Sequence, residues 1–184
     1  MPALACAAAL AAAPSASADK LGGVEPPVSG VARTTESPIL KNQPGPTVRG
    51  KRGVLIRGKA YAPSRAPSAV KRVIWAANKI RHTPYKWGGG HGSWSDSGYD
   101  CSGAVSYALH GGGLLSYPMA SGPLMRWGTR GSGKWITVYA NRTHAFMVVA
   151  GMRFDTSGWG ERGPRWRAES RSTSGFARRH PPGL

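Results

Sequence analysis

Acidic residues are scarce in this sequence. Eight Asp and Glu stand against 25 Lys and Arg in 184 residues, which gives a formal net charge of +17. Such an excess predicts attraction to a polyanion: a nucleic acid, an anionic membrane or a cell-wall polymer. The shortage of carboxylates disfavours glycosyl hydrolysis by an acid pair. Phosphoryl transfer is disfavoured too, because no glycine-rich phosphate loop ending in Lys-Ser/Thr is present.

Cysteine is also scarce, with Cys6 and Cys101 as its two occurrences. No C-x-x-C pair occurs and the five histidines are scattered, so we expect no zinc site, no other metal and no cofactor. No apolar run of about 20 residues follows the N-terminus, so we expect no transmembrane segment.

The first 18 residues carry no charge and end in Ala16-Ser17-Ala18, which fits the small-residue cleavage site of a secretory signal peptide. We predict a signal peptide over residues 1–18 whose removal also removes Cys6. The basic region that usually begins such a signal is missing, and an alanine-rich start without a signal function is the alternative. An exported chain with one cysteine has either an intermolecular bond or a reactive thiol.

Residues 19–64 are rich in Pro, Gly, Ser and Thr and lack periodic apolar residues. We predict a disordered basic linker there, followed by one catalytic domain over residues 65–184. The short apolar run Val54–Ile56 leaves some packing against that domain open.

A first helix is predicted to begin after an N-cap at Ser68 and to run to about Arg81. One apolar stripe at helical spacing supports it, and Pro84 follows its end. The stripe is explained by core packing, and we assign it no chemistry.

A second helix is predicted to begin at Cys101, after a glycine-rich loop. Small and apolar residues recur at i+3, i+4 and i+7 from this cysteine, and Gly111–Gly113 ends the helix. A thiol in the first helical turn lies near free backbone N–H groups and the positive end of the helix dipole. Both favour the thiolate, which is the form a cysteine nucleophile needs. The alternative is a small buried apolar residue.

The last third of the chain predicts antiparallel strands, which after two helices give an α+β domain. Gly151-Met152 suits a two-residue type II′ hairpin loop, because glycine stands first. Residues 114–133 and 158–171 are expected to be irregular, the second of them basic. The predicted strands are Trp135–Tyr139, Ala145–Ala150, Arg153–Thr156 and a final edge strand within Gly175–Arg179.

His144 opens the second of these strands and is a candidate base for Cys101, since Cys and His distant in sequence are usual in thiol hydrolases. Asp155 is a candidate for orienting the imidazole. With the loop at Gly151-Met152, Asp155 faces Val148, on the same sheet face as His144 but roughly 13 Å along the strand. Contact then needs a bulge, a bend or a wider loop, so spacing alone leaves this partner open.

Three elements together resemble the NlpC-type cell-wall cysteine peptidases: the Tyr-x-Trp-Gly-Gly run from Tyr85, the Asp-Cys-Ser-Gly run over residues 100–103, and the strand led by His144. The resemblance covers roughly residues 68–157. It implies a circularly permuted papain-like fold, with N-terminal helices and the nucleophile helix packed on an antiparallel sheet.

The same resemblance implies hydrolysis of amide bonds in peptidoglycan stem peptides, often the D-glutamyl–diaminopimelate bond. Cys101 would be the nucleophile and His144 the general base and acid. Tyr85 would help to bind the developing oxyanion, and Asp100 and Ser102 would contact the amine end of the substrate.

The sequence departs from the family pattern in two places. The usual Pro-Gly-Asp-Leu before the histidine strand is replaced by Gly131–Trp135. The resemblance therefore leaves the choice of substrate open. The third polar residue of the family's site, commonly His, corresponds to a position near Asp155 or Thr156. The resemblance therefore leaves open which residue orients His144.

We therefore expect a secreted, wall-associated monomeric enzyme whose partners are stem peptides and anionic wall polymers, with Cys101, His144 and Asp155 as catalytic residues. An N-acetylmuramoyl-L-alanine amidase on the same scaffold is one alternative, and a catalytically silent basic wall-binding protein is another. Nucleic-acid binding has only the charge in its favour, and no nucleic acid is expected as a partner.

Overall fold

The computed structural model describes residues 44–158, 163–168 and 170–184. The chain divides into two units, Met1–Thr34 and Thr35–Leu184, and every described residue belongs to the second. The predicted signal peptide and most of the predicted linker lie outside the described residues. None of the described helices is both long enough and apolar enough to cross a membrane.

A three-stranded sheet precedes the first helix, where the linker was predicted. Its strands are β1 (Thr47–Val48), β2 (Val54–Ile56) and β3 (Lys59–Pro63), in the order β1-β3-β2. The boundary at residue 65 is therefore corrected: the folded part includes this sheet. Strands of two to five residues have too few positions for a clear alternating pattern in the sequence.

A buried amide ties this sheet to helix α1 (Ser68–Ile80). Asn78 Nδ2 donates to the Ala60 carbonyl at 2.8 Å, and the Ala60 N–H donates to Asn78 Oδ1 at 3.0 Å. Asn78 thus meets both backbone groups of a β3 residue, as a neighbouring strand would. Helix α1 has the predicted extent, but its N-cap is Pro67 rather than Ser68 and makes no side-chain cap bond.

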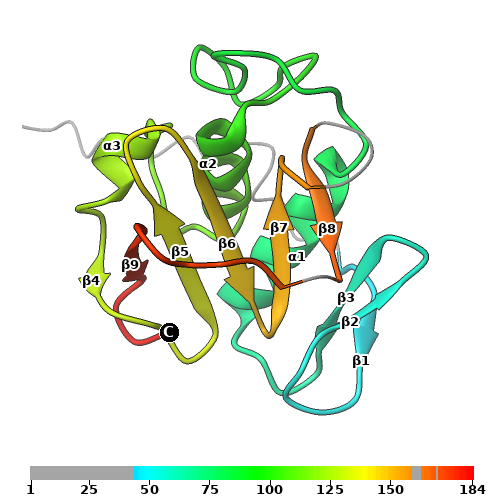
Figure 1. Ribbon diagram of the computed structural model, residues 1–184. Coiled ribbons are helices and arrows are strands. Elements are labelled where there is room, and N and C mark those ends of the chain that lie inside the picture. The colour runs from blue at the N-terminus through cyan, green and yellow to red at the C-terminus, as the bar shows by residue number, and fades with distance from the viewer. Residues whose placement is uncertain (1–43, 159–162, 169) are drawn as a thin grey trace, which may run out of the picture. The chain divides into compact units, whose positions relative to one another are not determined.

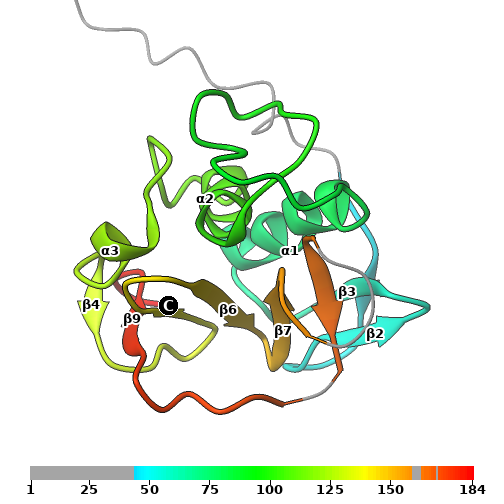
Figure 2. The ribbon, with the colours of Figure 1, turned by 45° about the horizontal axis from the view of Figure 1, so that its top comes forward.

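Helix α2 (Cys101–Gly111) begins at the cysteine and has its C-cap at Gly112, as predicted. It packs against α1, and a Cβ at Gly112 would collide with the Val73 side chain of that helix. Every residue of α2 is buried. Figures 1 and 2 show α1 and α2 lying together on one face of the larger sheet.

The larger sheet has six strands whose neighbours all pair antiparallel, and α2 packs on β6 and β7. The expected α+β class, with the nucleophile helix on an antiparallel sheet, is confirmed. In spatial order the strands are β4 (Thr129–Arg130), β9 (Ala177–His180), β5 (Ile136–Ala140), β6 (Ala145–Val149), β7 (Met152–Asp155) and β8 (Arg165–Arg167).

Three of the predicted connections and edges are corrected. Strand β9 is not an edge strand, because it pairs with β4 on one side and β5 on the other. The stretch 114–133 contains helix α3 (Ser121–Leu124) as well as β4, and the basic stretch 158–171 contains β8. These elements have two to four residues, too few to show a period in the sequence.

The hairpin between β6 and β7 turns at Ala150-Gly151, not at Gly151-Met152. Both loop residues have positive φ, 50° and 85°, as a type I′ turn requires. Pairing therefore runs Val149↔Met152 to Met147↔Phe154, and continuing it places Asp155 opposite Phe146 rather than Val148. This register brings Asp155 two positions closer to His144 along the strand than the predicted loop would.

Candidate active site

Cys101 is the first residue of α2, and its neighbours in the Asp-Cys-Ser-Gly run fix this helix start. Asp100 is the N-cap, and its Oδ1 accepts a 2.7 Å hydrogen bond from the Gly103 N–H. A Cβ at Gly103 would collide with the Gly89 carbonyl oxygen, so glycine lets the glycine-rich loop lie against the helix. Cys101 is 8% exposed and lies at the positive end of the helix dipole.

Tyr85 is brought to the start of α2 by its backbone. It forms a parallel bridge with Tyr99, which stands two residues before Cys101. The Tyr99 N–H donates to the Pro84 carbonyl at 3.1 Å, and the Lys86 N–H donates to the Tyr99 carbonyl at 3.4 Å. Tyr85 is 38% exposed, so its side chain is available at the surface.

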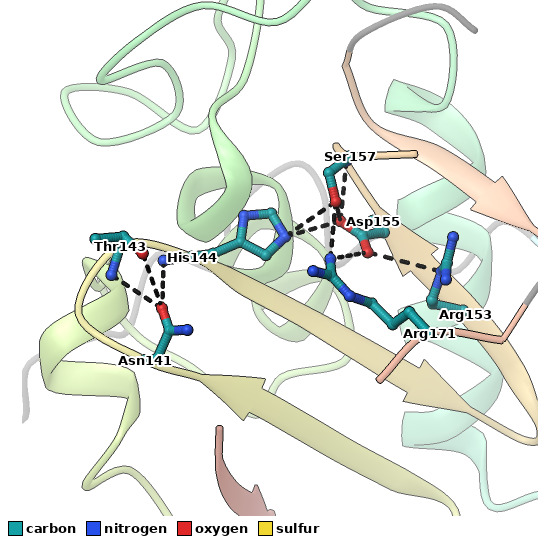
Figure 3. A network of polar contacts seen from close by, with 7 residues as sticks. All are labelled: Asn141, Thr143, His144, Arg153, Asp155, Ser157 and Arg171. Carbon is teal, nitrogen blue, oxygen red and sulfur yellow. Dashed lines mark hydrogen bonds and ion pairs between the residues drawn. The ribbon is translucent and has the colours of Figure 1, made fainter. Parts of the chain in front are cut away.

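His144 is held where the β5–β6 loop enters β6. Asn141 Oδ1 accepts hydrogen bonds from the N–H groups of His144 at 2.8 Å and of Thr143 at 3.0 Å. The Asn141 N–H in turn donates to the His144 carbonyl at 2.9 Å. The asparagine thus fixes the backbone that carries the imidazole (Figure 3).

Asp155 lies within hydrogen-bond distance of His144, as the corrected hairpin register allows. His144 Nε2 and Asp155 Oδ1 are 3.0 Å apart. The Asp155 side chain is completely buried and that of His144 is 19% exposed. A buried carboxylate needs charged or hydrogen-bonding partners to remain ionised.

Three further side chains, none of which has a role predicted from the sequence, supply those partners. Arg171 Nη1 donates to Asp155 Oδ2 at 2.8 Å and to Ser157 Oγ at 2.8 Å. Ser157 donates to Asp155 Oδ1 from both its N–H and its hydroxyl, each at 3.0 Å. Arg153 Nε lies 3.6 Å from Asp155 Oδ2. Figure 3 shows these groups converging on the carboxylate.

Arg171 reaches this position because the chain before β9 crosses the face of the sheet opposite α2 (Figure 1). Its guanidinium lies 4.7 Å from the ring centre of Phe146 and 5.4 Å from that of Phe176. In the sequence Arg171 is one of many arginines in a basic stretch. The signal that could have found it is indirect: a buried Asp155 requires a cation.

The titration of His144 and Asp155 is strongly coupled. Burial lowers the pKa of His144, but hydrogen bonds to Asp155 and to Cys101 raise it more, so that it reaches about 9. Burial raises the pKa of Asp155, but its hydrogen bonds to His144, Ser157 and Arg171 lower it to about 2. Near neutral pH the arrangement therefore holds an imidazolium whose two partners are an ionised carboxylate and the Cys101 side chain.

Asp100 and Ser102 also lie together, in contact with a histidine that had no predicted role. His91 Nε2 lies 3.0 Å from Asp100 Oδ1 and 3.2 Å from Ser102 Oγ. The Ser102 hydroxyl donates to Asp100 Oδ1 at 3.1 Å. His91 follows the glycines of the loop, and its place after Gly90 gave no indication that it would turn back toward the helix cap.

No family model matches the sequence, and no curated protein matches it either. Solved structures do. The peptidoglycan hydrolase RipB from Mycobacterium tuberculosis is 28% identical, with a TM-score of 0.49 over 63% of this chain and 69% of that chain. The P60 domain of a Mycobacterium avium subspecies paratuberculosis antigen is 24% identical, with a TM-score of 0.48 over 60% of this chain and 93% of that chain.

The solved structures with this likeness thus include a peptidoglycan hydrolase and a P60 domain.

Proposed function

We propose that this protein is a secreted cysteine peptidase that hydrolyses amide bonds in peptidoglycan stem peptides. The observation that carries the proposal is the position of His144. Its imidazole has Asp155 as one hydrogen-bond partner, at 3.0 Å, and the Cys101 side chain as another. A nucleophile, a base and a group that orients the base are the parts required for acyl transfer through a thioester.

In the proposed reaction, His144 holds the proton of the Cys101 thiol, and the thiolate attacks the carbonyl carbon of the scissile amide. The developing oxyanion accepts hydrogen bonds from a backbone N–H at the start of α2 and from the Tyr85 hydroxyl. His144 then protonates the leaving amine as the C–N bond breaks, which leaves a thioester on Cys101. Water attacks the thioester with His144 as base, releasing the carboxylic acid and restoring the thiol.

Asp155 keeps the imidazole oriented throughout, because its carboxylate stabilises the imidazolium that each half-reaction forms. We assign Asp100 and Ser102 to binding the amine end of the substrate. Their hydrogen bonds to each other and to His91 support this role, since they hold polar oxygen atoms at the helix start beside Cys101.

Within this reaction class we propose the D-glutamyl–diaminopimelate bond as the target. The experiment is mass spectrometry of muropeptides after purified peptidoglycan is incubated with the wild-type protein or with Cys101→Ser. Cleavage at the proposed bond leaves a disaccharide-dipeptide. An N-acetylmuramoyl-L-alanine amidase would leave a disaccharide without peptide, and a silent wall-binding protein would match the Ser variant and contradict the proposal.

We further propose that the net charge of +17 attaches the enzyme to anionic wall polymers. Exposed charges are screened over a Debye length of about 8 Å at physiological salt. Sedimentation with intact walls should therefore fall steeply with added salt, while turnover of a small soluble stem peptide should change much less. Equal losses in both assays would contradict this separation of attachment from catalysis.

A further inference from the structure

A cavity of about 470 Å³ lies where β4, β9 and the end of α3 come together. Four of the residues that line it are arginines: Arg126, Arg130, Arg178 and Arg179. No carboxylate is among its lining residues in the part of the chain that the structure describes. The volume is in the range of small-ligand pockets, and the lining favours an anion.

Two of these arginines are cross-strand partners. Arg130 on β4 pairs directly with Arg179 on β9, so two like charges lie side by side on neighbouring strands. Such a pair destabilises a sheet unless something compensates it. Arg179 is also fixed in place, since its Nε donates to the Met125 carbonyl at 2.6 Å. A bound anion would offset the repulsion of this pair.

The cavity lies beside the proposed active site, on the His144 side. Phe176 lines the cavity, and its ring meets the His144 ring edge-on, with the ring centres 6.3 Å apart. A general acid faces the amine that it protonates, so the fragment that leaves as the amine lies on the side of His144. The ring of Phe176 therefore separates the cavity from His144, the residue that protonates this fragment in the proposed reaction.

We propose that this cavity binds a carboxylate of the leaving fragment of the substrate. The inference rests on the proposed function and adds to it a site for substrate recognition. Guanidinium groups match a carboxylate by paired hydrogen bonds, and Phe176 and Met125 supply apolar surface for the carbon chain that carries it. A phosphate group of a wall polymer shares this anionic chemistry, and the experiment separates the two sources.

The test uses two soluble stem peptides that differ only in the leaving fragment, one with a free carboxylate and one with a carboxamide. The proteins are the wild type, the double variant Arg130→Gln/Arg178→Gln, and Arg57→Gln as a control. Arg57 is an exposed arginine in the turn between β2 and β3, so its loss changes the net charge without touching the cavity. Thermal unfolding checks that each variant is folded.

We expect the wild type and Arg57→Gln to cleave the carboxylate peptide with a kcat/KM about tenfold above that of the carboxamide, which is the size of a charge-assisted hydrogen bond. The double variant should lose this preference and cleave the carboxamide as the wild type does. Equal rates of the wild type on both peptides would overturn the assignment and leave the proposed function intact.

A double variant that keeps the preference but no longer sediments with teichoic-acid-containing walls would assign the cavity to the polymer and overturn the carboxylate proposal. If the wild type cleaved neither peptide, the proposed function itself would fail.

Discussion

Two histidine–aspartate pairs lie near the start of α2, and they have the same separation but different surroundings. His144 Nε2–Asp155 Oδ1 and His91 Nε2–Asp100 Oδ1 are both 3.0 Å. The Asp155 side chain is fully buried, whereas that of Asp100 is 13% exposed and that of His91 is 25% exposed. Of the two histidines, His144 is the one with Cys101 as a side-chain partner.

The partners of the two carboxylates explain the difference. Asp100 accepts from backbone N–H groups of Gly103 at 2.7 Å and Gly88 at 3.2 Å, so it fixes the loop and the helix start. Asp155 instead accepts from Arg171 and Ser157 and holds the imidazole. A short His–Asp distance is therefore not enough to identify a catalytic pair, and the comparison predicts different effects for matched changes in the two pairs.

The largest difference is expected between Asp155→Asn and Asp100→Asn. Asp155→Asn removes the charge that stabilises the imidazolium, so kcat on a soluble stem peptide should fall about 100-fold or more. Asp100→Asn keeps an N-cap acceptor and should chiefly raise KM. Steady-state kinetics on both variants measure the changes in kcat and in KM separately. If Asp155→Asn kept the wild-type kcat, Asp155 would not be the residue that orients His144, and another group, such as Thr156 or a backbone carbonyl, would have that role.

The next effect concerns stability against pH. The pKa of His144 is raised from 6.5 to about 9, so the protonated imidazole stabilises the folded state. This contribution is fully present below pH 6.5 and is lost as the pH rises through 9. The wild-type free energy of unfolding should fall by at most about 3 kcal/mol over this window. The free energy of unfolding, measured by urea unfolding between pH 6.5 and 9, should fall in this way for His91→Gln but not for His144→Gln. An equal dependence on pH in the two variants would contradict the difference between the two histidines.

A smaller effect is expected for Arg171, which positions Asp155 without touching the substrate. Arg171→Gln should lower kcat about tenfold with KM nearly unchanged, because one charged hydrogen bond is lost while Ser157 and Arg153 remain. Arg171→Lys keeps the charge and should recover part of the loss, which a purely structural role would not require. If the Gln variant had wild-type kcat, the positioning role would be excluded.

The smallest effect is predicted for His91. His91→Ala removes one hydrogen-bond partner from Asp100 and Ser102, so KM should rise about two- to tenfold while kcat stays constant. Kinetics on the soluble peptide are again the measurement. A fall in kcat as large as that of Asp155→Asn would mean that the two pairs share the chemistry, and the comparison would fail.

Local patterns explain what the sequence predicted well. Cys101 and the glycines after α2 mark that helix within a few residues, and the apolar run after His144 marks β6. The predicted hairpin register is wrong by one residue because glycine alone marks the turn in the sequence, whereas Ala150 also adopts positive φ in the structure. That one-residue error moved Asp155 two positions away from His144 along the strand.

Contacts between distant segments explain what the sequence did not predict. Arg171 reaches Asp155 across the sheet, and the partner of β4 is β9, some 50 residues later. Strands as short as β4 and β8 have no period to recognise, so their positions depend on the neighbours with which they pair.

We infer that His144 activates the Cys101 thiol, and the rate of iodoacetamide labelling of the native protein at pH 6.5 tests this activation without any substrate. Peptide mass mapping follows Cys101 separately from Cys6. The thiolate is the reacting form, so wild-type Cys101 should label at least about tenfold faster than Cys101 in His144→Gln. Equal rates in the two proteins, or labelling of Cys101 only after unfolding in denaturant, would contradict the account.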